Sequence, residues 1–184
     1  MIYNSLDGVL ETKFHQFDAE YVSTEGNRIE GYASLFGIAD QGGDTVAKGA
    51  YAQSLHRLDA KGRSVKMLWQ HDPTRPIGVW DEVKEDATGL YVRGRILTEI
   101  QAGREAMALI DAGAIDGLSI GYRTVKAEPA ANGGRILHEL ELWEVSMVTF
   151  PMLPEARVGA SDQDAQLASD LADVIAQARR ELLA

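Results

Sequence analysis

The sequence contains no cysteine and comparatively few basic residues, and each shortage excludes some classes of protein. Without cysteine there is no disulfide scaffold, no thiolate zinc site and no cysteine nucleophile. The absence is also consistent with a reducing compartment. Lysine and arginine total 18 against 28 aspartates and glutamates, which gives a formal net charge of −10. A surface of that sign repels phosphate backbones, so we expect no nucleic-acid partner.

Long apolar runs and metal-binding spacings are missing as well. No stretch approaches the length of a membrane span, and no basic patch precedes an apolar stretch at the N-terminus. We therefore expect a soluble protein with neither a membrane partner nor a secretory signal. The sequence has no H-E-x-x-H motif or comparable spacing, so a metal hydrolase is disfavoured and no cofactor is expected. Its 184 residues, of which 45% are hydrophobic, suffice for one domain with a core plus a tail.

The stretch with the clearest chemical content is Gly117–Gly121, a G-x-S-x-G pattern around Ser119. A serine hydroxyl becomes a nucleophile when a base takes its proton, and glycines without a Cβ let a substrate backbone approach. The same pattern marks the nucleophile elbow of α/β-hydrolases, which needs a strand–turn–helix and a downstream acid and histidine. Here a helix-like segment precedes Ser119, a strand follows it, and only His138 lies downstream. The pattern predicts a nucleophilic serine on a mostly β scaffold; an idle serine at a strand start is the alternative.

His71 is the candidate base. The segment from Val65 to Gln70 is rich in β-forming residues and predicts a central buried strand. Because Pro73 cannot donate to a β-ladder, the strand is expected to end there. A histidine held at the end of a buried strand suits a general base, whereas a purely structural turn histidine is the alternative.

Glu144 is the candidate acid, and its assignment depends on strand alternation. Residues 135–150 predict a long return strand, in which Glu144 shares a face with Leu140, Leu142 and Val148. A carboxylate on an apolar face costs on the order of several kcal/mol unless it is paired, and a histidine donor would satisfy it. The alternatives are a β-bulge that turns Glu144 outward, or a structural pair with an arginine.

The remaining segments predict an alternation of strands with two helices, followed by a third helix. Strands are expected at 28–36, 44–46, 77–85, 90–97 and 118–128, and helices from 48 to about 61 and from about 98 to 112. Apolar residues recur at helical spacing from 161 to the C-terminus, which predicts an amphipathic helix. The expected organisation is an N-terminal arm or first strand (1–27), a main domain (28–158) and a helical tail (159–184).

In chain order, His71, Ser119 and Glu144 supply the base, nucleophile and acid of a serine-protease triad. His138 flanks the strand of Glu144 and is a rival third member. The sequence does not identify the oxyanion donors; backbone N–H groups near Arg123 or after His71 are the candidates.

Several blocks of the sequence resemble the prohead (capsid-maturation) proteases of tailed phages. In the family's order and spacing they span about residues 28 to 158, and they are Gly31–Phe36, Asp44–Tyr51, Leu68–Asp72, Ile77–Gly78, Gly117–Tyr122 and Glu144–Pro151.

This resemblance implies a serine endopeptidase that processes capsid and scaffold proteins inside the immature capsid, in the cytoplasm of the bacterial host. Its implied partners are the major capsid protein with its scaffolding segment and further copies of itself, and it would usually cleave its own ends. The family is similar to the herpesvirus maturation protease, which implies an α+β fold with a mostly antiparallel, β-barrel-like core flanked by helices.

The family's histidine and serine correspond to His71 and Ser119, and its Glu-x-Ser block favours Glu144 as the third member. The herpesvirus enzyme uses a second histidine instead, which keeps His138 open. Two other functions remain alternatives: a non-enzymatic, protease-like scaffold or capsid-binding module, and a small esterase.

Overall fold

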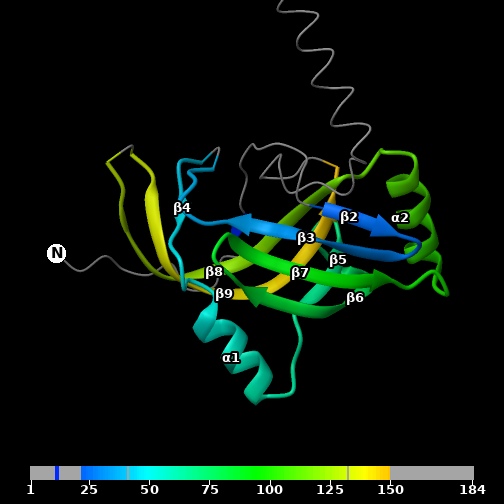
Figure 1. The fold of residues 1–184 in the computed structure, drawn as a ribbon, viewed down its shortest axis with the longest axis horizontal. Coiled ribbons are helices and arrows are strands. Elements are labelled where there is room, and N and C mark those ends of the chain that lie inside the picture. Colours follow the sequence, from blue (N-terminus) through cyan, green and yellow to red (C-terminus); the bar gives the residue numbers. More distant parts are fainter. Residues whose placement is uncertain (1–10, 13–21, 41, 132, 150–184) are drawn as a thin grey trace, which may run out of the picture.

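The computed structural model describes residues 11–12, 22–40, 42–131 and 133–149 (Figure 1). In these residues the chain forms one curled sheet of nine strands with two helices, so the fold is α+β as predicted. The elements are β1 (Glu11–Thr12), β2 (Val22–Glu25), β3 (Arg28–Leu35), β4 (Thr45–Val46), α1 (Ala52–Ala60), β5 (Lys66–Trp69), β6 (Asp72–Glu85), β7 (Gly89–Ile96), α2 (Gln101–Asp111), β8 (Gly117–Pro129) and β9 (Arg135–Val148).

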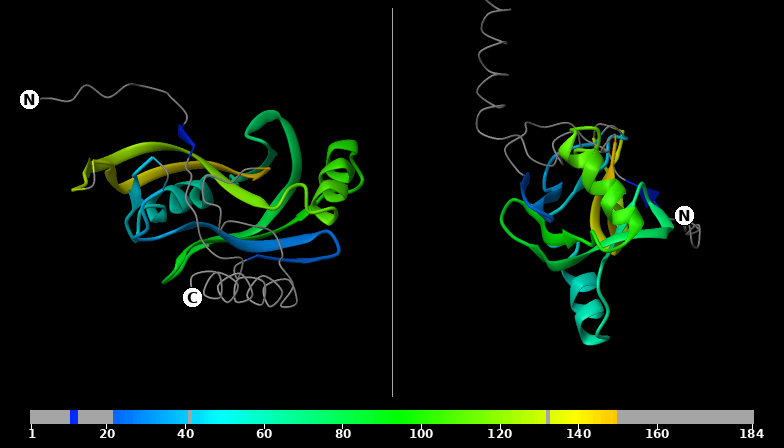
Figure 2. Two further views of the ribbon diagram at one scale, coloured as in Figure 1. Left: turned by 90° about the horizontal axis from the view of Figure 1, so that it is seen from above. Right: turned by 90° about the vertical axis from the view of Figure 1, so that its right-hand side faces the viewer.

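The strands follow the order β1-β8-β9-β5-β6-β7-β3-β2, and β4 pairs with β9 off this path. Most neighbours are antiparallel, but β4 and β5 both run parallel to β9. The two helices lie at separate places around the curled sheet (Figure 2). Buried side chains from most of the strands and from α2 form one core, against which Leu55 and Leu58 of α1 pack; its largest fully buried members include Tyr51, Tyr122, Ile29, Met67 and Leu140.

Helix α1 takes the place of a strand along part of β9. On this side of β9, β4 pairs with residues 136–137 and β5 with residues 144–147, which leaves a gap between them. Across that gap, the N–H of Leu140 donates to the carbonyl of Ala50 and the N–H of Leu142 donates to Ser54 Oγ, both at 2.9 Å. The N-terminal side of α1 therefore satisfies backbone donors that no strand reaches.

Strand β9 contains a bulge at Trp143 that corrects the alternation expected from the sequence. Gly121 lies opposite Glu144 and Tyr122 lies opposite Leu142, so Trp143 has no partner on β8. Since Gly121 and Tyr122 are consecutive and point to opposite faces, Glu144 and Leu142 do so as well. Glu144 is therefore not on the apolar face of Leu142, as strict alternation predicted, but on the opposite face of the sheet.

The link between β5 and β6 is tighter than predicted. Trp69 pairs with Asp72, and the two residues between them, Gln70 and His71, have φ angles of 53° and 61°. Positive φ at both central residues is the requirement of a type I′ hairpin turn. The strand thus ends before His71, and Pro73 lies inside the following strand β6, near its start, where proline is tolerated.

Some sequence predictions fall on residues that the structure does not describe. The amphipathic helix expected from 161 onward lies outside the described residues, and the limits 28–158 and 159–184 stay predictions. Within 1–27, the described pieces β1 and β2 belong to the same sheet as the other strands. No helix in the described ranges is long and apolar enough to cross a membrane.

Candidate active site

The three residues singled out in the sequence come from three elements that the sheet places next to one another. His71 lies in the turn after β5, Ser119 on β8 and Glu144 on β9, and β9 is the strand between the other two. Ser119 lies opposite Ser146, two residues along β9 from Glu144, so both positions face the same side of the sheet.

The imidazole of His71 bridges the serine and the carboxylate. Its Nε2 lies 2.8 Å from Ser119 Oγ, and its Nδ1 lies 2.5 Å from Glu144 Oε1. A carboxylate can only accept, so Nδ1–H donates to Glu144 and Nε2 is left to accept the hydroxyl proton of Ser119. This is the tautomer that lets an imidazole act as the base of a nucleophilic serine.

The structure brings neither His138, the rival third member, nor the neighbouring carboxylate of Glu141 to the imidazole of His71. His138 Nε2 lies 2.9 Å from a carboxylate oxygen of Glu128. Glu141 accepts two hydrogen bonds from the guanidinium of Arg123, at 2.6 and 2.9 Å. Both pairs are partly exposed, as is common for ion pairs at a protein surface.

The site is largely closed to solvent. Ser119 is 1% exposed and Glu144 is 4% exposed, whereas the His71 side chain keeps 21% of its surface. A buried carboxylate must be paired, and Glu144 has two partners because its second oxygen accepts from Ser146 Oγ at 2.5 Å. Low local polarity strengthens each of these interactions relative to water.

Ser146, which was not among the residues predicted from the sequence, ties the carboxylate to the turn that carries the histidine. Its hydroxyl donates to Glu144 and accepts the backbone N–H of His71 at 3.1 Å. The turn is also held at Gln70, whose backbone N–H donates to the carbonyl of Met147 at 2.9 Å. These bonds hold a backbone conformation that non-glycine residues adopt rarely. The spacing Glu-x-Ser was the available signal, because residues two apart in a strand share a face.

Gly121 has a different role from the one predicted for the flanking glycines. A Cβ at this position would lie 2.1 Å from Glu144 Oε1. The missing side chain therefore makes room for the carboxylate beneath His71, rather than for a substrate backbone. Among the described residues, no group of three histidine, aspartate or glutamate side chains is placed to hold a metal ion.

Comparison with known proteins identifies the family. The sequence profile of the caudovirus prohead serine proteases matches residues 15–170. The chain belongs to this family. The resemblance seen in the sequence blocks is thereby confirmed.

Two curated relatives are similar to this chain in sequence. The chain is 34% identical to the prohead protease of Enterobacteria phage HK97 over 135 residues, which cover 72% of this chain and 59% of the relative. It is 33% identical to the capsid polyprotein of Pseudomonas phage PAJU2 over 113 residues, 55% of this chain and 17% of that protein. The chain thus spans less than two thirds of the length of either relative.

The fold is similar to that of the bacteriophage T4 capsid assembly protease. The TM-score is 0.58 at 16% identity, with 76% of this chain and 96% of the T4 chain covered. At that identity the likeness concerns the fold alone.

Proposed function

We propose that the chain is a serine endopeptidase of capsid maturation in which Ser119 is the nucleophile, His71 the general base and acid, and Glu144 the residue that orients the imidazole. The observation that carries this proposal is the pair of bonds from one imidazole to Ser119 and Glu144. Membership of the prohead serine protease family supports the same reaction.

The geometry accounts for each proton in the reaction. Ser119 Oγ attacks the carbonyl carbon of the scissile peptide bond while His71 Nε2 takes the hydroxyl proton. The imidazolium, stabilised by the carboxylate of Glu144, then returns the proton to the leaving amine, and an acyl-enzyme remains. Water, deprotonated by the same nitrogen, attacks the acyl carbon, and the imidazolium returns that proton to Ser119 Oγ as the second product leaves. The proposed oxyanion donors are backbone N–H groups after His71; those near Arg123 are too far away, because Arg123 is four residues, or about 13 Å, along β8 from Ser119.

The finer details of fold and biology are part of this proposal. We infer that the curled sheet is of the herpesvirus maturation protease type, with glutamate in place of the second histidine. The proposed substrates are the major capsid protein with its scaffolding segment, and the ends of this chain itself, inside the immature capsid in the host cytoplasm. Residues 28–158 would be the catalytic domain, which associates with further copies, and 159–184 a tail that engages a partner or is removed. The names of the relatives, which refer to capsids and proheads, support this setting.

Co-expression with the major capsid protein of the same particle tests the proposal. With the wild-type chain, the capsid protein should lose an N-terminal segment, which intact-mass spectrometry measures. With Ser119→Ala it should keep its full length. If particles assemble with the wild-type chain and the capsid protein stays full length, the chain is a non-enzymatic assembly module.

The close contact at Gly121 leads to a prediction about an apparently mild substitution. In Gly121→Ala the new methyl group occupies the place of Glu144 Oε1, so the carboxylate must move away from His71 Nδ1. We expect turnover of a peptide substrate to fall by up to about 10⁴-fold, the loss seen when a triad loses the correct imidazole tautomer. Overpacking of this kind should also lower the free energy of unfolding by about 1–3 kcal/mol, which urea denaturation measures.

A second variant separates this explanation from general misfolding. Glu144→Asp shortens the acid, so the double variant Gly121→Ala/Glu144→Asp should fold more stably than Gly121→Ala alone. Wild-type turnover in Gly121→Ala would show that the packing of Glu144 against residue 121 does not hold the carboxylate in place.

A further inference from the structure

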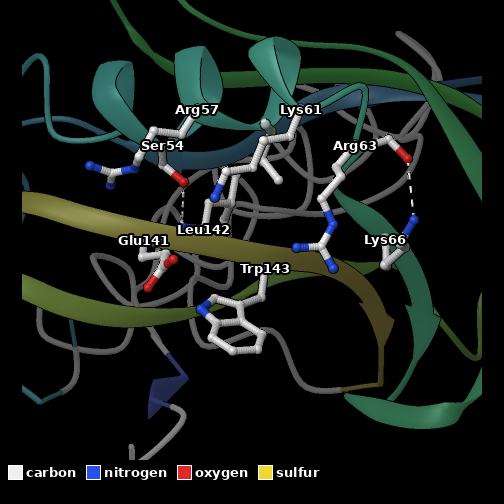
Figure 3. Close-up of a pocket in the computed structure, with 10 residues that line it drawn as sticks. Ser54, Arg57, Lys61, Arg63, Lys66, Glu141, Leu142 and Trp143 are labelled. Atoms are coloured by element: carbon white, nitrogen blue, oxygen red, sulfur yellow. Dashed lines mark hydrogen bonds between the residues drawn. The ribbon is translucent and has the colours of Figure 1, made fainter. Parts of the chain in front are cut away.

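A concave feature lies between α1 and β9 (Figure 3). It is a pocket of about 210 Å³ whose lining includes four basic side chains, Arg57, Lys61, Arg63 and Lys66, and the indole of Trp143. We call these five residues the basic groove. The one acidic residue in the lining of the pocket, Glu141, pairs with Arg123. Such a cluster is unusual in a chain with a formal net charge of −10.

Three of the four cations have no anionic partner in the part of the chain that the structure describes. Arg57 contacts Glu139 at 3.3 Å, but no carboxylate among the described residues lies within ion-pair distance of Lys61, Arg63 or Lys66. The only hydrogen bond of the Lys66 ammonium there goes to Ser64 Oγ at 3.4 Å. In Figure 3 the side chains of Lys61 and Arg63 extend toward β9. Their mutual repulsion is relieved when an anion binds among them.

The basic groove reaches the face of the sheet on which His71, Ser119 and Glu144 meet. Strand β5 is parallel to β9 and pairs Lys66 with Glu144, and paired residues of neighbouring strands point to the same face. From Ser119 to Lys66 the path crosses two strand spacings and runs two residues along β9. With spacings of about 4.8 Å between strands and about 3.3 Å per residue, the two Cα atoms are about 12 Å apart. An extended peptide covers that distance in three to four residues.

Trp143 gives the basic groove an apolar surface. It is the bulge residue of β9, without a partner on β8, and 52% of it is exposed. Bulges redirect a side chain away from the regular alternation of a strand. An exposed indole beside several cations suits a ligand that has both acidic and apolar groups.

We propose that the basic groove binds an acidic stretch of the polypeptide substrate, beginning three to four residues from the scissile bond on one side of it. This inference rests on the proposed function. The position of Lys66 beside Glu144 favours a peptide that also occupies the candidate site. A nucleic acid is charged at every residue, so the net charge of −10 repels it more strongly than a peptide with one short acidic stretch. The acidic side chains pair with Lys61, Arg63 and Lys66, and apolar groups between them lie on Trp143.

The test uses the full-length chain and a library of peptides prepared from a digested proteome, whose cleavage sites are identified by mass spectrometry. In the wild type, aspartate and glutamate should be enriched three to seven residues from the cleaved bond on one side. The variant Lys61→Gln/Arg63→Gln/Lys66→Gln should lose this enrichment while keeping the same preference next to the bond. For a peptide with the acidic stretch, kcat/KM should fall by about tenfold, mainly through KM, since exposed ion pairs each contribute modestly.

A matched control removes the same charge elsewhere. Arg28→Gln/Arg93→Gln/Arg95→Gln changes β3 and β7 and should retain the enrichment. Raising the salt concentration should slow cleavage of the acidic peptide by the wild type and have little effect on the groove variant, because salt screens exposed charges.

The possible failures are distinguishable. Cleavage by the wild type without acidic enrichment, or enrichment that survives in the groove variant, overturns the basic groove as a peptide site and leaves the proposed function standing. Tight binding of a single-stranded oligonucleotide that the groove variant alone loses would reassign the groove to nucleic acid. A wild type that cleaves nothing overturns both proposals.

Discussion

Replacing Ser119 with alanine is expected to abolish peptide cleavage while the protein stays folded. Loss of the nucleophile removes the covalent pathway, and binding and oxyanion stabilisation alone leave a residual rate of only about 10³–10⁴ above water. The fold should tolerate the change because the small side chain on β8 loses one hydrogen bond, to His71. Cleavage rates and thermal unfolding of both proteins measure the two effects.

The matching change at His71 should cause a loss of similar size, and combining the two should add little. Members of one catalytic unit are strongly non-additive, so the double variant should be about as inactive as either single one. Asparagine is the suitable replacement, because residue 71 has φ of 61° and asparagine tolerates this region. If the two losses multiplied, Ser119 and His71 would act independently and the triad would be refuted.

Glu144→Gln is expected to keep the fold and lower turnover by up to about 10⁴-fold, the loss produced by an acid-to-amide change in a serine-protease triad. The reason lies in the tautomer. If the amide NH₂ faces the imidazole, Nδ1 must accept, so the ring proton moves to Nε2, which then cannot take the proton of Ser119. Single-turnover cleavage of a peptide substrate measures the chemical step directly.

Two neighbouring variants serve as controls for Glu144. Glu141→Gln should be nearly silent, because Glu141 pairs with Arg123. His138→Ala should cost at most a modest factor, because His138 pairs with Glu128. A large loss confined to His138→Ala would assign the third role to His138, as in the herpesvirus enzyme. A large loss confined to Glu141→Gln would mean that this carboxylate, rather than Glu144, reaches the imidazole.

Local patterns were enough to predict the main elements but not the phase of β9. The apolar stripe of α1 predicted a helix and the β-rich run at β5 predicted a strand, because the period of the apolar residues reflects which face is buried. Alternation fails at Trp143, since one extra residue reverses every face beyond it. Nothing in the sequence around Trp143 marks the bulge, which depends on pairing with β8. Glu144 was therefore chosen because it was assigned to the face of Leu142, and that assignment is wrong. It contacts His71 because the bulge places it on the face of Ser119 and Ser146.

The remaining features of the site depend on contacts between distant segments. A two-residue turn at Gln70 and His71 lacks the glycine or asparagine that usually signals such a turn. It is held by bonds to β9, more than 70 residues away in the chain. The space beside Gly121 is likewise defined by a carboxylate on another strand. Sequence motifs singled out the candidate residues, and the register between strands determines how their atoms meet.

The central claim is that the bridge from Glu144 through His71 makes Ser119 nucleophilic, and labelling with a fluorophosphonate tests it most directly. The probe reacts with activated serines, and peptide mapping by mass spectrometry locates the adduct. The account predicts a single adduct on Ser119 in the full-length wild type, none in Ser119→Ala, and strongly slowed labelling in His71→Asn and Glu144→Gln. A cleavage-competent wild type that carries its adduct on another serine, or labels equally fast without His71, would contradict it.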